Sequence, residues 1–141
     1  MKSQSILIVS ALAIGLAHTA MAQQPSGMHR YAFFFKYSNQ AAKAMIENPQ
    51  DRAAQAAKLA ESFGGRMESI YWFPMGGEYD GMTIEQFPSD ATIEALNLLA
   101  MSGGNFAKTQ SIPLMTSDEF KGAMEKAKST TTSYTAPTAT K

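Results

Sequence analysis

The sequence predicts an α+β fold in which a four-stranded antiparallel sheet carries its helices on one face. A dense aromatic run opens the domain, and strand-like and helix-like segments then follow in the order β-α-β-β-α-β-α. Paired glycines end the two longer helical segments, at Gly64-Gly65 and Gly103-Gly104. A split βαβ order of this kind is typical of a ferredoxin-like sandwich, in which the first and third strands are central.

The first strand is predicted over residues 29–37, which read HRYAFFFKY. Side chains alternate between the faces of a strand, and here both faces are apolar, so both sides of the strand need cover. The helices supply one cover and a second sheet would supply the other. One face holds Tyr31, Phe33, Phe35 and Tyr37, and the other holds Ala32 and Phe34.

Two helical segments follow the first strand. The first is predicted over residues 38–47, and Asn48 with Pro49 then predicts a new helix, with Asn48 as its N-cap and Pro49 at its first position. Apolar residues three and four positions apart predict one buried stripe on this second helix. The stripe consists of Ala53, Ala56, Ala57, Ala60 and Phe63.

The rest of the domain is a hairpin, a helix, a strand and a helix. Strands are predicted over residues 66–73 and 80–87, joined by a glycine-rich loop. Ser89 predicts the cap of a helix that buries Ile93, Leu96, Leu99 and Ala100. A last strand over residues 105–115 leads to a helix over residues 117–128, which Phe120 and Met124 would anchor.

The two ends of the chain are predicted to lie outside this domain. Residues 1–22 combine Lys2, an apolar run over residues 6–17 and the small-x-small pattern of residues 20–22, which indicates a secretory signal peptide cut after Ala22. The apolar run is shorter than a membrane span, so we expect no stable membrane anchor after cleavage. Residues 129–141 are rich in Ser and Thr and predict a disordered tail. The domain thus covers residues 28–128, in a periplasmic or secreted protein.

Composition narrows the classes of function. Cleavage removes Lys2 and leaves one more acidic than basic side chain, so there is no basic field for nucleic acid. The chain has no cysteine, and His29 is the only histidine after Ala22. We therefore expect no metal site, no haem and no other cofactor, because a single imidazole rarely makes a closed site. Phosphate-binding and serine-nucleophile motifs are absent from the sequence.

Nine short segments follow one another in order over nearly all of residues 30–125. They are Arg30-Tyr31, Lys36-Tyr37, Pro49-x-x-Arg52, Phe63-Gly64-Gly65, Tyr71-Trp72, Gly77-Glu78-Tyr79-Asp80, Pro88-Ser89-Asp90, Gly103/Gly104-Asn105 and Asp118-Glu119-Phe120. With these segments the chain resembles the GYD domain family. The resemblance implies a fold of the dimeric α/β barrel superfamily and names no reaction. A bare aromatic sheet face independently favours dimerisation, so we expect the chain to form a homodimer or higher homo-oligomer.

Five residues are candidates for binding a ligand: Tyr71, Trp72, Tyr79, Asp80 and Glu85. Tyr71 and Trp72 would stack on an aromatic molecule or form core and dimer contacts. Tyr79 and Asp80 would line a pocket mouth or simply fasten a turn.

Glu85 lies in the predicted third strand, and its side chain points to the opposite face from those of Met82 and Ile84. If those two side chains meet the helices, Glu85 points into the space between two sheets. Burial there would raise its pKa and make it a proton acceptor, unless it pairs with Arg66 or Lys108 or faces solvent.

Two classes of function remain open. The first is a small-ligand-binding or self-assembling module, whose ligand would be a small apolar or aromatic molecule. The second is a cofactor-independent enzyme of the dimeric α/β barrel type, resembling monooxygenases or isomerases, with Glu85 or Asp80 as base and Tyr79 or Tyr71 as hydrogen-bond donor. A catalytic Glu85 should be buried, unpaired and open to a cavity.

Overall fold

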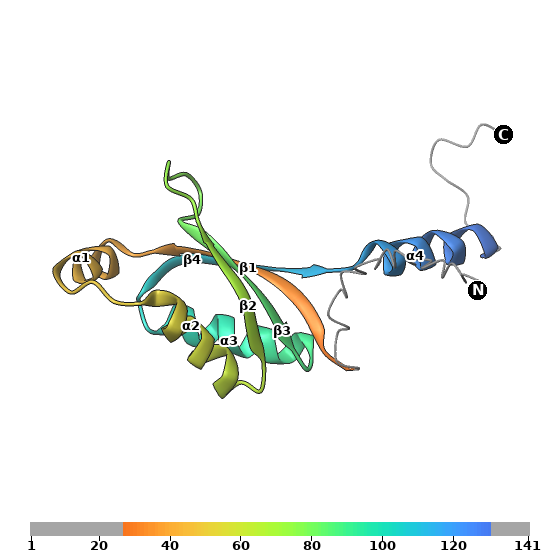
Figure 1. Ribbon diagram of the computed structural model, residues 1–141, viewed down its shortest axis with the longest axis horizontal. Coiled ribbons are helices and arrows are strands. Elements are labelled where there is room, and N and C mark those ends of the chain that lie inside the picture. The colour runs from red at the N-terminus through yellow and green to blue at the C-terminus, as the bar shows by residue number, and fades with distance from the viewer. Residues whose placement is uncertain (1–26, 131–141) are drawn as a thin grey trace, which may run out of the picture.

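The computed structural model describes residues 27–130, and the predicted signal peptide over residues 1–22 and nearly all of the predicted tail lie outside them. The described chain forms one four-stranded antiparallel sheet and four helices (Figure 1). The strands are β1 (His29–Tyr37), β2 (Arg66–Trp72), β3 (Gly81–Phe87) and β4 (Phe106–Leu114). The helices are α1 (Asn39–Glu47), α2 (Arg52–Ser62), α3 (Asp90–Ser102) and α4 (Ser117–Ser129).

The sheet has the strand order β2-β3-β1-β4, which confirms that the first and third strands are central. In the register of β1 with β3, Tyr31 lies opposite Glu85 and Phe33 lies opposite Thr83. Residues that lie opposite each other in an antiparallel pair point to the same face, so β3 sends Glu85 and Thr83 to the face that holds the aromatic side chains of β1.

Local signals set most helix ends, with one exception. Ser89 caps α3 as predicted, because its side chain accepts a hydrogen bond from the backbone N–H of Thr92. The prediction that Asn48 caps the second helix is wrong: Asn48 ends α1, and its backbone N–H donates to Ala44. Asp51 instead caps α2, accepting a hydrogen bond from the N–H of Ala54. Both Asn and Asp suit a cap; four residues, 48–51, connect the two helices, and the last of them is the cap.

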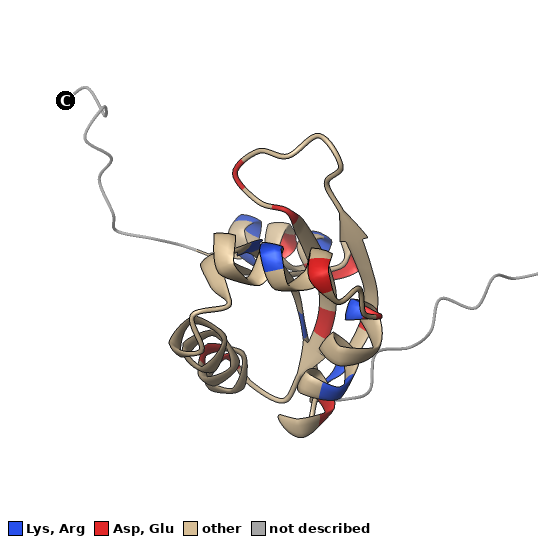
Figure 2. Cartoon of the chain, turned by 90° about the vertical axis from the view of Figure 1, so that its left-hand side faces the viewer, with Lys and Arg blue, Asp and Glu red and all other residues tan. Residues whose placement is uncertain are grey.

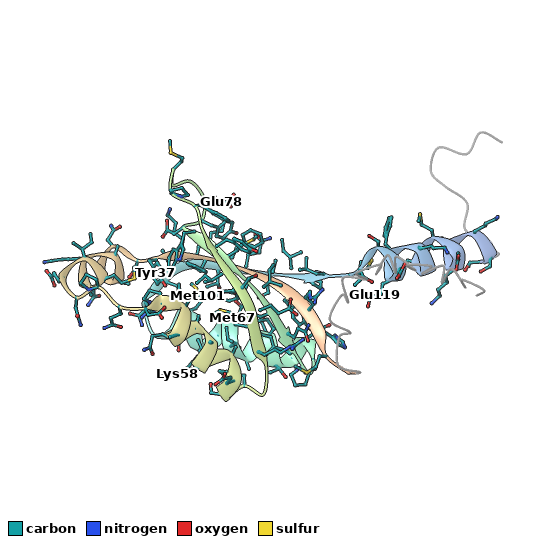
Figure 3. The ribbon with its side chains drawn as sticks, viewed as in Figure 1. Tyr37, Lys58, Met67, Glu78, Met101 and Glu119 are labelled. Atoms are coloured by element: carbon teal, nitrogen blue, oxygen red, sulfur yellow. The ribbon has the colours of Figure 1, made fainter. Side chains whose placement is uncertain are left out.

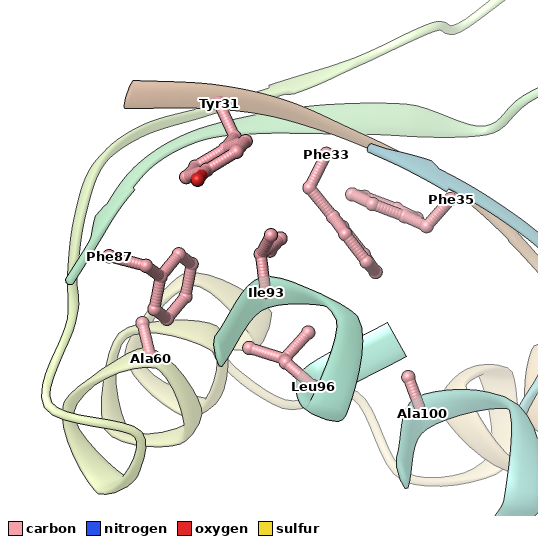
Figure 4. Close-up of a cluster of buried hydrophobic side chains, with 8 residues drawn as sticks. All are labelled: Tyr31, Phe33, Phe35, Ala60, Phe87, Ile93, Leu96 and Ala100. Carbon is pink, nitrogen blue, oxygen red and sulfur yellow. The ribbon is translucent and has the colours of Figure 1, made fainter. Parts of the chain in front are cut away.

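The core lies between the sheet and helices α2 and α3. Tyr31, Phe33 and Phe35 point from β1 toward the α3 side chains Ile93 and Leu96 (Figure 4). The buried cluster is completed by Ala60 of α2, Phe87 of β3 and Ala100 of α3. The predicted inner face of α3 is confirmed at three positions, but Leu99 is half-exposed because it lies at the edge of the layer.

The other face of the sheet has no helix over it (Figure 1). Its apolar side chains include Phe34, Met82 and Ile84 in the central strands, with Tyr71 on β2 and Ile112 on β4. Tyr71 and Ile112 are 53% and 39% exposed, which leaves apolar surface open to solvent. Acidic and basic residues are interspersed over the elements rather than gathered by sign (Figure 2).

Helix α4 differs from the prediction that Phe120 and Met124 anchor it. It continues from β4 as an arm beyond the body of the domain, where Glu119 lies (Figures 1 and 3). None of its side chains is buried, and Phe120 and Met124 are 55% and 53% exposed. The arm is nevertheless well capped, because Thr116 and Glu119 form a reciprocal capping box. Among residues 27–130, no helix has the length and hydropathy needed to cross a bilayer.

Candidate functional site

A cavity of about 350 Å³ opens between the sheet and the helices α2 and α3. Aromatic side chains of β1 form its sheet wall, at Phe33, Phe35 and Tyr37, and Leu59 and Leu96 face them from the helices. The volume falls at the lower end of the range for small-molecule sites. Helix α2 contributes Arg52, Gln55, Ala56 and Leu59 to its wall, and α3 contributes Leu96, Leu99 and Ala100.

Glu85 lines this cavity and is 3% exposed. The expectation that it points between two sheets is wrong, because Met82 and Ile84 lie on the open face and Glu85 lies on the helix face. The alternative of an ion pair with Arg66 or Lys108 is also wrong. The Arg66 guanidinium lies 3.8 Å from Oε1 of Glu68, and Lys108 forms an ion pair with Glu78. Glu85 is therefore buried, without a cationic partner among the described residues, and open to a cavity.

Burial raises the pKa of the Glu85 carboxyl to about 7. The nearby Thr83 hydroxyl lowers the pKa, but by less than burial raises it. Thr83 Oγ1 and Glu85 Oε2 are both buried without a hydrogen-bond partner of ordinary geometry. At neutral pH the carboxyl is thus divided between its charged and neutral forms and is able to accept or to donate a hydrogen bond.

Arg52 is the cavity residue that sequence reasoning missed. It begins α2, lines the cavity, and holds its guanidinium carbon 6.0 Å from the centre of the Tyr37 ring. Its Nε is buried without an acceptor, and it makes no ion pair within the described chain. The signal was present, since Arg52 belongs to the Pro49-x-x-Arg52 segment, but a lone arginine at a helix start does not by itself indicate a pocket.

Orphaned polar atoms gather at this cavity. Four buried side-chain atoms of the described residues lack a hydrogen-bond partner, and three of them belong to Arg52, Thr83 and Glu85. Buried polar groups are normally satisfied, because leaving one unpaired costs about 1–3 kcal/mol. Three unpaired polar atoms in one mostly apolar cavity are typical of a binding site for a ligand with polar groups.

The glycine-rich loop before β3 does not reach this cavity. Asp80 accepts hydrogen bonds from the backbone N–H of Tyr37 at 2.9 Å and from Lys36 Nζ at 3.3 Å. Tyr79 donates to Gln110 and packs its ring 5.4 Å from that of Phe34. Lys108 Nζ lies over the Tyr79 ring, 4.8 Å from its centre. These contacts are those of a turn fastened to β1 and β4 by a tyrosine.

The two adjacent aromatic candidates lie on opposite faces of β2. Trp72 stacks on Tyr37, a residue of the cavity wall, with ring centres 6.2 Å apart. Tyr71 lies opposite Met82 on the open face of the sheet. The structure thus brings Glu85 to the cavity, places Trp72 next to it, and keeps Tyr71, Tyr79 and Asp80 apart from it.

His29 lies at the exposed start of β1, where its Nδ1 is 3.4 Å from Asp90 Oδ1. The hydroxyl of Tyr31 donates to the same carboxylate at 2.5 Å, which ties β1 to the start of α3. Within residues 27–130 there is no group of three or more His, Cys, Asp or Glu side chains arranged for a metal ion.

Comparison with protein families finds one match: the family model described as GYD domain covers residues 31–124. Those residues contain the whole sheet except its first two positions and most of α4. No curated protein matches the chain.

Proposed function

The chain belongs to the GYD domain family, and we propose that it binds a small, mostly apolar molecule in the cavity between the sheet and helices α2 and α3. The observation that carries the proposal is the gathering of unpaired buried atoms of Arg52, Thr83 and Glu85 in one apolar cavity. A ligand that hydrogen-bonds to those atoms would remove the free-energy cost of leaving each of them unpaired.

A second candidate function is proton transfer by Glu85, in a cofactor-independent enzyme. One observation favours it: the Glu85 carboxyl has a pKa near 7 and faces the cavity without a cation beside it, as a general base should. Asp80, Tyr79 and Tyr71 have no part in this version, because they do not line the cavity. Deuterium incorporation from heavy water into a recovered ligand, absent with Glu85→Gln, would favour this candidate over simple binding.

We also propose that a second copy of the chain covers the open sheet face. Each copy carries two apolar surfaces without cover: the face around Tyr71 and Ile112, and the α4 stripe of Phe120 and Met124. Within one chain they do not meet, whereas a two-fold axis would let each copy cover the other's surfaces and close the assembly.

Native mass spectrometry of the protein purified from its natural host tests these proposals together. We expect the mass of a chain cut after Ala22, a dimer or larger assembly, and additional mass from a bound small molecule. The cavity variant Ala56→Phe should lose the additional mass, because Ala56 lines the cavity.

The control Ala54→Phe should keep that mass, because Ala54 is exposed on the same helix. Additional mass that survives Ala56→Phe would place the ligand elsewhere and contradict the binding proposal.

A further inference from the structure

The cavity's buried polar atoms without a hydrogen-bond partner lie toward its two ends, whereas Gln55 and Asn105 are further polar residues of the lining. Arg52 packs against Tyr37 at the end of β1, whereas Thr83 and Glu85 lie in the rows of Phe33 and Tyr31. At about 3.4 Å per residue, those rows are about 14 and 20 Å from the row of Tyr37. The guanidinium carbon of Arg52 lies 6.0 Å from the centre of the Tyr37 ring, so a ligand that touches both ends must be elongated.

The stretch between the two ends is apolar. Phe35 lies on the sheet side, Leu59 on α2, and Leu96 and Ala100 on α3. A flat aromatic body fits such walls, because ring-on-ring and ring-on-aliphatic contacts bury the most apolar area for the fewest rotatable bonds.

The Arg52 end calls for an anion. Its guanidinium has a buried N–H without an acceptor and no acidic partner in the described chain. A guanidinium presents its donors in a plane that matches the two oxygens of a carboxylate. A neutral acceptor would satisfy the N–H but leave the positive charge without a counter-ion.

The inner end calls for a group that both donates and accepts. Glu85 and Thr83 are two residues apart on one face and are 3% and 2% exposed, and neither Glu85 Oε2 nor Thr83 Oγ1 makes a hydrogen bond of ordinary geometry. A hydroxyl can donate to the carboxyl and accept from the threonine. A second carboxylate there would meet the charge of Glu85, and a bare hydrocarbon end would leave both atoms unsatisfied.

From this arrangement we infer that the cavity binds an elongated carboxylic acid with an aromatic body, its carboxylate on Arg52 and a hydroxyl at its far end on Thr83 and Glu85. The inference rests on the proposed binding function and names the chemical class of the ligand.

The experiment is titration calorimetry with three matched probes on the full-length mature protein. They are para-hydroxyphenylpropionate, its des-hydroxy analogue phenylpropionate, and its neutral amide. We expect the hydroxy acid to bind at least about tenfold more tightly than either analogue, since each analogue loses one charge-assisted or buried hydrogen bond.

Variants then separate the two ends. Arg52→Gln should abolish the preference for the acid over the amide and keep the preference for the hydroxyl. Thr83→Val combined with Glu85→Leu should do the reverse. Lys58→Gln is the control for Arg52, because Lys58 is an exposed cation on the same helix and does not line the cavity. Thermal unfolding checks that each variant is folded.

The outcomes distinguish the inference from the function beneath it. Equal binding of all three probes, lost in Ala56→Phe, would leave a binding cavity and overturn the ligand class. Binding of none of them at millimolar concentration would overturn the ligand class while the native mass decides the binding function. Probe binding unchanged in Ala56→Phe would overturn both.

Discussion

At the scale of single residues, the buried carboxyl of Glu85 lowers the stability of the fold at neutral and higher pH. A carboxyl that burial makes hard to ionise binds its proton more tightly in the folded chain than in the unfolded one. Its folded pKa of about 7 lies above its ordinary value of 4.5. The protonated Glu85 carboxyl therefore contributes to the stability of the folded state below pH 4.5. That contribution is lost as the pH rises through 7. Such a cost is understandable where a cavity needs a titrating group.

The variant Glu85→Gln tests this cost. At pH 8 we expect the free energy of unfolding to rise by up to about 3 kcal/mol, because the amide has no charge to desolvate. At pH 4 the gain should vanish, since the wild-type carboxyl is then protonated in both states. Urea denaturation at the two pH values gives the comparison.

Glu61→Gln serves as the control on the exposed side of α2. Its effect should stay within about 0.5 kcal/mol at both pH values, as for most surface substitutions. If Glu85→Gln raised the free energy of unfolding equally at pH 4 and pH 8, the pKa of Glu85 would not be raised in the folded protein.

At the scale of elements, the turn from α2 into β2 depends on close backbone approach. Gly64 adopts a positive φ of 70° after the Phe63 cap, which reverses the chain. At Gly65 a Cβ would lie 2.4 Å from the ring of Phe87 and 2.5 Å from the carbonyl oxygen of Gln86. Phe87 is fully buried and Gln86 O belongs to the backbone, so neither atom can easily move away.

Gly65→Ala should therefore destabilise the fold by about 2 kcal/mol or more, through overpacking at the end of the core. Gly122→Ala is the matched control in α4, where a Cβ meets no atom within 4 Å. Its effect should be at most about 1 kcal/mol and toward stability, because alanine favours a helix. Thermal unfolding followed by circular dichroism measures both, and equal effects would contradict the close-packing account.

At the scale of the whole molecule, two parts of the described chain leave apolar side chains exposed: helix α4 and the open face of the sheet. Helix α4 has 13 residues and no buried side chain, so its caps, its helix propensity and local pairs such as Lys121–Glu125 hold it. Isolated helices of this length are marginal in water. The open sheet face offers apolar area that a partner would bury. Both features have one economical explanation in the proposed second copy.

Replacing both Phe120 and Met124 by serine should weaken self-association at least about a hundredfold, since two buried apolar side chains contribute several kcal/mol together. The control replaces Lys121 and Glu125 by serine, an exposed i,i+4 ion pair on the same helix. It should change association little. Sedimentation velocity over a range of concentrations measures both, and a wild-type protein that stays monomeric throughout would contradict the proposal.

The sequence by itself determined the order of elements, the central strands and most helix ends. These follow from period-two and helical spacing, from Ser89 as a cap and from glycines that permit a reversal, all of which act over a few residues. The family resemblance was likewise readable, because its segments recur along nearly the whole domain.

Only the tertiary structure decided where Glu85 points, that Arg52 shares its cavity, and that α4 leaves the body of the domain. Alternation separates the two faces of a strand without telling which face the helices cover, so Glu85 and Met82 were interchangeable until the sheet and helices were placed together. Arg52 and Glu85 are far apart in the chain, and the cavity depends on how side chains from six helices and strands leave one space unfilled. Local sequence patterns therefore cannot predict the cavity.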